Sequence, residues 1–161
     1  MKVLKFGGTS VGSEKNIKQV ISILNDYSEK DNVIAVVSAV GGITNKLLKA
    51  GELAKIQNLK YVSVYEEIHS KHIELIKALI PNNNDEIVNN TISNLQSLKQ
   101  LLDGIYLIHE ISPSTTDKLS SYGELLSSQI IAEAMRYQKL DAQVKNSQEL
   151  IVTDDTHTKA E

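Results

Sequence analysis

The sequence predicts an α/β fold in which parallel strands are covered by helices. The first 56 residues alternate strand, glycine-rich loop and helix, and then repeat that order. Residues 33–37 form an uninterrupted apolar, mostly β-branched run, which is typical of a strand buried on both faces of a parallel sheet. The chain has no Trp and is only 4% aromatic, so its core must consist mainly of Ile, Leu, Val and Ala, as in α/β sandwiches.

Length and composition exclude several classes of protein. The 161 residues suit one domain, and 41% hydrophobic and 23% charged residues are typical of globular proteins. The formal net charge of −3 gives no indication of a nucleic-acid or anionic-membrane surface. The absence of cysteine excludes disulfides and thiolate metal sites. With neither a signal-peptide pattern nor a membrane-spanning stretch, we expect a soluble cytoplasmic protein.

The first elements follow in a regular order. Residues 3–6 are expected to form a short strand that ends at two glycines. A helix follows, with Ser13 as its N-cap and apolar residues at helical spacing. Residues 33–37 form the second strand, and a second helix is expected at about residues 44–56. A strand, crossover helix and strand in this order imply parallel pairing with a right-handed crossover.

The middle of the chain is predicted to be helical. Residues 61–80 and 85–108 both have helical periodicity. Pro81 and a run of three asparagines separate them, which favours a turn. We therefore expect a helical hairpin inserted at about residues 58–110.

The last part is expected to return to the sheet. Residues 111–117 are predicted to be a polar connection, followed by a helix from near residue 117 to 137, and residues 142–145 are a candidate third strand. Asp154-Asp155 is expected to be a solvated turn. Three or four strands are fewer than the roughly five or six of a typical sheet. We expect an incomplete sheet in this chain, with an edge strand and an apolar face uncovered.

The segment after the first strand carries the strongest chemical signal. It reads Lys5-Phe6-Gly7-Gly8-Thr9-Ser10. Two glycines let backbone N–H groups approach an anion closely, Lys5 adds a positive charge, and the following helix adds about half a charge at its N-terminus. The segment matches neither the Walker A nor the dinucleotide-binding pattern. It predicts a phosphate cradle; the alternative is a glycine turn with Lys5 in solvent.

Two further segments bear on the same site. They read Ser38-Ala39-Val40-Gly41-Gly42-Ile43-Thr44-Asn45 and Ser121-Tyr122-Gly123-Glu124. Open α/β sheets bind ligands beyond the carboxyl ends of their strands, so the two glycine loops would line one crevice, where Ser38 and Thr44 would donate to a carboxylate or phosphate. The alternatives are a glycine turn with Thr44 as N-cap, and a solvated Glu124 at a helix start.

These three segments, in this order, resemble the aspartate kinase branch of the amino acid kinase family, including the kinase part of bifunctional aspartokinase–homoserine dehydrogenases. The resemblance implies an αβα sandwich with a mostly parallel central sheet, of which residues 1–161 form the N-terminal part of one catalytic domain. It implies transfer of the γ-phosphoryl group of MgATP to the side-chain carboxylate of L-aspartate, the first step of lysine, threonine and methionine biosynthesis. It also implies a homo-oligomeric full-length protein.

The same resemblance assigns roles to residues. Lys5 corresponds to the lysine that meets the transferred phosphoryl group. The loop around the ATP phosphates corresponds to Gly7, Gly8, Thr9 and Ser10. Ser38 and Thr44 correspond to residues that hold aspartate, and Glu124 to the acid that faces its ammonium group. Mg²⁺ would arrive with ATP, and no residue of this chain is expected to bind a metal. Glu66-x-x-His69 lacks the second such pair that a dinuclear site needs.

The sequence also departs from the family pattern. Many relatives have His or Arg where Tyr122 stands, and a later G-R-x-G-S-D segment supplies an arginine and an aspartate to the active site. This chain has no such segment, and its one arginine is Arg136. We expect the 161 residues to be inactive alone. The alternatives are another amino acid kinase, acting on glutamate, acetylglutamate, carbamate or a nucleotide, and a non-catalytic ligand-binding or assembly module.

Overall fold

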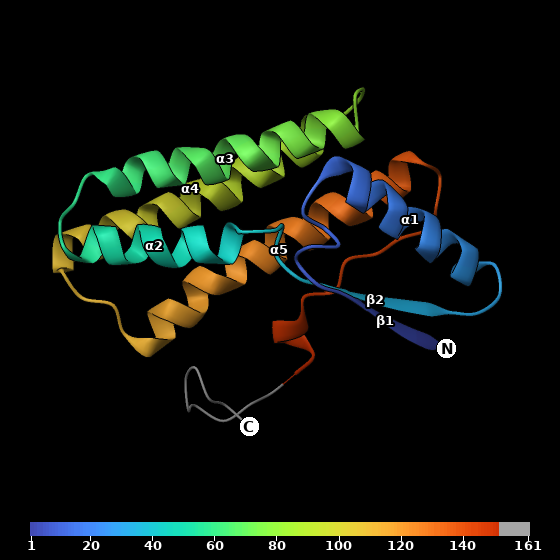
Figure 1. The fold of residues 1–161 in the computed structure, drawn as a ribbon, viewed down its shortest axis with the longest axis horizontal. Coiled ribbons are helices and arrows are strands. Elements are labelled where there is room, and N and C mark those ends of the chain that lie inside the picture. Colours follow the sequence, from blue (N-terminus) through green and yellow to red (C-terminus); the bar gives the residue numbers. More distant parts are fainter. Residues whose placement is uncertain (152–161) are drawn as a thin grey trace.

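A computed structural model of the chain describes residues 1–151, which contain two strands and five α-helices (Figure 1). The elements are β1 (Lys2–Phe6), α1 (Glu14–Ser28), β2 (Val33–Val37), α2 (Ile43–Lys55), α3 (Lys60–Leu79), α4 (Asp85–Ile108) and α5 (Pro113–Tyr137), followed by a short 3₁₀ turn (Ser147–Glu149). The turn expected at Asp154-Asp155 lies outside the described residues. None of the helices within residues 1–151 combines the length and apolarity needed to cross a membrane.

The two strands pair in parallel, as predicted, in a register that runs from Lys2 opposite Val33 to Phe6 opposite Val37. One face of this sheet packs against the core. The other face carries apolar side chains that are exposed: Val3 (61%), Ile34 (48%) and Val36 (46%). The prediction that the second strand is buried on both faces is therefore wrong for the described residues: none of the five residues of β2 is fully buried, and its three central residues are exposed. The predicted uncovered apolar face is confirmed.

Helix α1 packs against β2, and its start is determined by residues close to it in the sequence. Ser13 adopts an extended conformation, and its Oγ accepts a hydrogen bond from the Asn16 N–H at 3.2 Å, which caps the helix as predicted. Glu14 in the first turn favours the helix dipole and pairs with Lys18 at 2.6 Å. The buried face of α1 consists of Ile17, Val20, Ile21 and Leu24.

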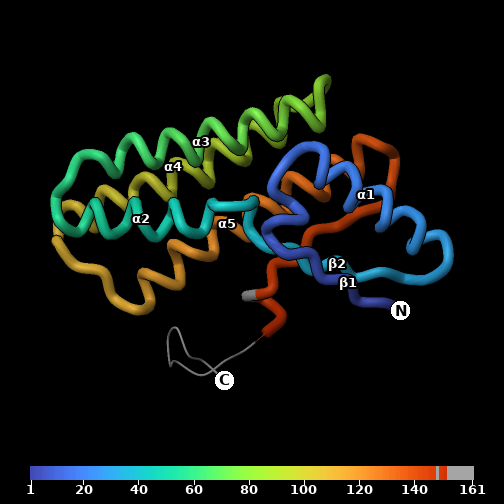
Figure 2. The backbone as a smooth tube through the Cα atoms, in the orientation of Figure 1, coloured from blue at the N-terminus to red at the C-terminus, as the bar shows by residue number. Residues whose placement is uncertain are grey.

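Helices α2 to α5 form a bundle beside the sheet (Figure 2). The predicted helical hairpin corresponds to α3 and α4, which run side by side and are joined at residues 80–84. Helix α5 links the two parts of the molecule, because it contacts α2, α3 and α4 in the bundle as well as α1 and β2. Residues in and directly after β2 are therefore within reach of α5.

Two expectations about the last elements are wrong. Helix α5 begins at Pro113 rather than near residue 117, because the Ser112 Oγ accepts from the Thr115 N–H at 3.1 Å and proline suits a first helical position. Residues 142–145 do not form a strand, and the described residues contain two strands rather than three or four. A strand needs a partner for its backbone groups, whereas the Ala142 carbonyl oxygen accepts from Arg136 Nη1 at 2.9 Å.

Candidate functional site

The loops that follow β1 and β2 lie against each other at the same edge of the sheet. A Cβ added to Gly8 would lie 3.2 Å from the Ala39 carbonyl oxygen. A Cβ added to Gly41 would lie 3.1 Å from the Gly8 carbonyl oxygen and 3.2 Å from the Gly12 Cα. Backbone thus packs directly on backbone, and this contact requires glycine. The two glycine-rich segments of the sequence form one continuous surface.

Hydrogen bonds hold the first loop in shape. The Ser10 N–H donates to the Gly7 carbonyl at 2.9 Å, and the Asn16 side chain donates to the Thr9 carbonyl at 2.7 Å. Sequence reasoning did not find Gly12 or Asn16. Both lie near the start of α1, where a glycine and an amide are common for capping alone, so their loop contacts could not be inferred from position.

The loops present backbone donors that have no acceptor in the part of the chain that the structure describes. Within residues 1–151, the N–H groups of five loop residues make no hydrogen bond to the protein: Gly7, Gly8, Thr9, Gly41 and Gly42. Gly42 is the N-cap of α2, with φ of 81°, and offers no side chain to cap the helix. Unsatisfied N–H groups at a helix N-terminus carry partial positive charge and favour anions. The arrangement is chemically suited to bind phosphate or carboxylate groups.

Lys5 lies near the end of β1 and has no hydrogen-bond or ion-pair partner within residues 1–151. It is exposed and occupies the residue before the end of β1, opposite Val36. Because side chains alternate along a strand, Lys5 lies on the open face of the sheet and not on the face of Leu4 and Phe6. Its ammonium group makes no hydrogen bond or ion pair with the described part of the chain.

Helix α5 brings the third segment to the second loop. Gly123 packs so closely that an added Cβ would lie 2.6 Å from the Ala39 Cβ. Glu124 Oε1 accepts from the Ala39 N–H at 3.4 Å, so its carboxylate faces this loop rather than solvent alone. The hydroxyl of Ser127, a residue that the sequence did not single out, donates to the Ser38 carbonyl at 2.8 Å.

The remaining predicted residues have less specific surroundings. Thr44 is half-buried in the first turn of α2, and the alternative that it caps this helix is wrong because Gly42 is the N-cap. The Thr9 and Ser10 side chains make no hydrogen bond within residues 1–151. Tyr122 is half-buried, and burial raises the pKa of its hydroxyl.

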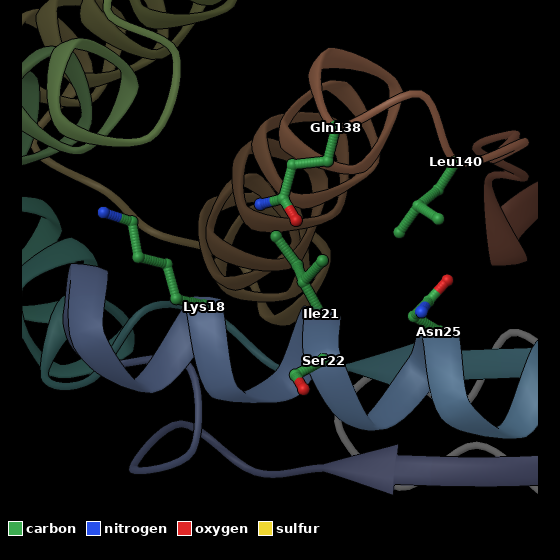
Figure 3. A pocket seen from close by; sticks show the side chains of 6 residues that line it. All are labelled: Lys18, Ile21, Ser22, Asn25, Gln138 and Leu140. Atoms are coloured by element: carbon green, nitrogen blue, oxygen red, sulfur yellow. The ribbon is translucent and has the colours of Figure 1, made fainter.

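Other features of the described residues do not belong to this surface. A cavity of about 390 Å³ lies between α1 and the segment after α5, and its lining includes no loop residue (Figure 3). Lys18, one of its lining residues, is already paired with Glu14. Within residues 1–151, no three His, Asp or Glu side chains converge to form a metal site.

The fold and the site together define an α/β protein in which two loops at the carboxyl ends of parallel strands present backbone N–H groups suited to anions. The chain belongs to the amino acid kinase family, whose sequence model matches residues 1–159. The predicted fold class, an α/β fold of the amino acid kinase type that is incomplete in this chain, is confirmed by this match and by the solved structures described next.

Within that family, the chain is similar to aspartokinases. The chain is 38% identical over 158 residues to aspartokinase 1, chloroplastic, of Arabidopsis thaliana, and spans 27% of that protein. Escherichia coli aspartokinase III in complex with lysine and aspartate superimposes with a TM-score of 0.86 at 27% identity over 99% of this chain and 34% of that one. The same enzyme with aspartate and ADP gives a TM-score of 0.84 at 28% identity. The predicted resemblance is thereby confirmed, and the chain corresponds to about a third or less of each relative.

Proposed function

We propose that this chain is the N-terminal part of an aspartate kinase catalytic domain. The full-length polypeptide would transfer the γ-phosphoryl group of MgATP to the side-chain carboxylate of L-aspartate, giving 4-phospho-L-aspartate for lysine, threonine and methionine biosynthesis. One observation carries the proposal: two loops packed backbone to backbone present five N–H groups without an acceptor in the described part of the chain. A similar solved structure holds aspartate and ADP, which are an acceptor and a product of this reaction.

The nucleotide side of the reaction would use the first loop. In the transfer, an aspartate carboxylate oxygen bonds to the γ-phosphorus while the bond to the bridging oxygen of ADP breaks. Negative charge spreads over the three outer oxygens, and N–H groups and cations around them lower the barrier. The N–H groups of Gly7, Gly8 and Thr9, the hydroxyls of Thr9 and Ser10, and the Lys5 ammonium would supply that environment. Mg²⁺ would enter as part of the substrate MgATP.

The acceptor side would use the second loop and α5. Ser38 and Thr44 would hold the carboxylates of aspartate with neutral donors, which orient a nucleophile without pairing with its charge. Glu124 would face the substrate ammonium, and the charge-assisted bond would favour amino acids over simple dicarboxylates. Its Oε1 contact with the Ala39 N–H leaves the second carboxylate oxygen for this purpose.

An assay of ADP release tests the proposal. The full-length chain and residues 1–161 should each be incubated with MgATP and aspartate, glutamate, acetylglutamate or carbamate. We expect release that depends on aspartate in the full-length chain only. Lys5→Ala should lower kcat by about a hundredfold, since a charged group at the transferred phosphoryl acts mainly in the transition state.

Lys2→Ala is the matched control, because Lys2 is an exposed lysine of the same strand that packs over the Tyr27 ring at 4.7 Å. It should leave kcat within about twofold of the parent value, as expected of an exposed lysine remote from the reacting groups. Turnover with glutamate but not aspartate would assign the chain to another acceptor. Nucleotide binding without turnover of any acceptor by the full-length chain would indicate a non-catalytic module.

A further inference from the structure

One turn of α5 holds the peptide group between Ser38 and Ala39 at both of its polar ends. The Ser127 hydroxyl donates to the carbonyl oxygen of this group at 2.8 Å. Glu124 Oε1 accepts from its N–H in a longer contact of 3.4 Å. Because a peptide group is planar, it cannot rotate about its flanking bonds without lengthening one of these two contacts. The absence of a Cβ at Gly123 allows α5 to lie this close.

Ser127 differs from two other serines of its helix. Ser121 and Ser128 donate to carbonyl groups of α5 itself, those of Lys118 and Leu125, at 2.9 and 3.0 Å, the usual behaviour of helical serine. Ser127 is 1% exposed and instead donates to a residue 89 positions away. Within residues 1–151, no other group donates to the Ser38 carbonyl.

We propose that Ser127 is a positioning residue of the aspartate site. It fixes the Ser38–Ala39 peptide and thereby the direction of the Ser38 hydroxyl and of the N–H groups at Gly41 and Gly42. The inference rests on the proposed function, in which Ser38 holds a carboxylate of aspartate. Ser127 does not itself contact the substrate but acts through Ser38.

The effect of Ser127 falls on the aspartate side more than on the ATP side. The ATP loop has its own support, because Asn16 holds the Thr9 carbonyl at 2.7 Å. Without the Ser127 hydroxyl, the Ser38–Ala39 peptide group is free to move. The Ser38 hydroxyl then shifts by part of an ångström and makes a weaker hydrogen bond to the substrate carboxylate. The KM for aspartate rises while the KM for ATP stays unchanged.

The test uses the full-length chain with Ser127→Ala and, as matched control, Ser128→Ala. Ser128 is the adjacent residue of the same helix, is half-buried, and bonds only within α5. Ser127→Ala should raise the KM for aspartate by about three- to tenfold, the range expected from one lost hydrogen bond. The KM for ATP should change by less than about twofold in both variants, because neither hydroxyl bonds to the first loop. Ser127→Thr, which retains the hydroxyl, should restore most of the affinity for aspartate.

A double-mutant cycle decides whether Ser127 acts through Ser38. In a Ser38→Ala background, Ser127→Ala should add little to the KM for aspartate, since two residues in one chain of contacts are not additive. Full additivity overturns the inference, as does an equal rise in both KM values or an aspartate KM like that of Ser128→Ala. If Ser127→Ala does not fold, Ser127→Cys is judged by the same criteria. A parent enzyme without aspartate-dependent turnover overturns the proposed function instead.

Discussion

At the residue scale, the meeting of the two loops depends on a position where a side chain has no room. Gly41→Ala places a methyl group 3.1 Å from the Gly8 carbonyl oxygen and 3.2 Å from the Gly12 Cα. Backbone atoms cannot move aside as a flexible side chain can. We expect the substitution to lower the free energy of unfolding by about 1–3 kcal/mol, the usual cost of overpacking. Urea unfolding followed by circular dichroism measures it.

Gly104→Ala is the matched control for that substitution. An added Cβ at Gly104 meets no atom of the described residues within 4 Å, and the residue lies inside α4. Alanine is favoured over glycine in a helix, so the free energy of unfolding of this variant should rise by about 0.5–1 kcal/mol. Equal stabilities of the two variants would contradict the close approach of the loops.

His72 gives a second prediction at this scale, which concerns pH. Its side chain is fully buried in α3, Nδ1 lies 2.7 Å from the Ile68 carbonyl oxygen, and Nε2 has no partner within residues 1–151. Burial lowers the pKa of His72 below its usual value of 6.5. The unfolded chain therefore binds the proton more readily, so stability is full above pH 6.5 and falls as the pH drops below it.

Below that pH, the free energy of unfolding should fall by at most about 1.4 kcal/mol per pH unit, because one proton is involved. Urea unfolding of the parent chain at a series of pH values measures this slope. His72→Leu should flatten the slope, whereas His109→Asn should keep it, because His109 is exposed. An unchanged slope in His72→Leu would mean that other groups cause the acid sensitivity.

Sequence reasoning located the loop residues but not the residues that support them. Paired glycines directly after a strand are typical of loops whose backbone approaches a ligand closely, so Gly7-Gly8 and Gly41-Gly42 could be predicted as a site. Ser127 could not, because a serine within a helix is ordinary and its partner lies 89 positions away. Contacts across such separations depend on how α5 packs on the sheet, which no local pattern contains.

At the element scale, α3 and α4 are joined by a polar cluster as well as by their apolar core. The Tyr61 hydroxyl donates to Asp103 Oδ1 at 2.6 Å, and Lys99 donates to the same oxygen at 2.5 Å. The Tyr61 ring packs on Tyr106 with centroids 5.4 Å apart. Burial, with the adjoining Asp103, raises the pKa of Tyr61 to about 12, so its hydroxyl remains a donor at physiological pH.

Tyr61→Phe should therefore destabilise the helical hairpin by about 1–2 kcal/mol, because it removes a bond to a charged acceptor and keeps the ring. Tyr106→Phe is the matched control, since the Tyr106 hydroxyl makes no hydrogen bond with the described residues. That variant should lie within about 0.5 kcal/mol of the parent. Similar losses in both variants would indicate that ring packing, and not the carboxylate contact, joins the helices.

Element boundaries show which patterns can be interpreted locally. The starts of α1 and α5 both have a serine N-cap, yet only Ser13 was recognised, because Ser112 stands before Pro113 in a run of small polar residues. The expected strand at residues 142–145 failed for a different reason. Helical hydrogen bonds are local, whereas a strand forms only where another strand presents free backbone groups.

At the scale of the whole molecule, the open face of the two-stranded sheet is the feature least compatible with a stable monomer. Val3, Ile34 and Val36 are between 46% and 61% exposed, and within residues 1–151 both strands have an unpaired outer edge. Apolar faces and free strand edges favour pairing with another chain. We expect residues 1–151 or 1–161, expressed alone, to self-associate as the protein concentration rises, which sedimentation velocity measures directly.

Ile34→Thr tests whether the open face of the sheet causes the self-association. Threonine keeps the β-branched shape that suits a strand but makes the exposed face more polar, so self-association should weaken. Leu107→Gln is the matched control, because Leu107 is 75% exposed but lies in α4, within the helical bundle. Equal weakening by both substitutions would mean that general surface hydrophobicity drives association, and a parent chain that stays monomeric at all concentrations would contradict the prediction.

In the full-length chain, where the proposed kinase domain would cover this face, Ile34→Thr should instead lower the melting temperature, since a buried methyl group is replaced by an unpaired hydroxyl.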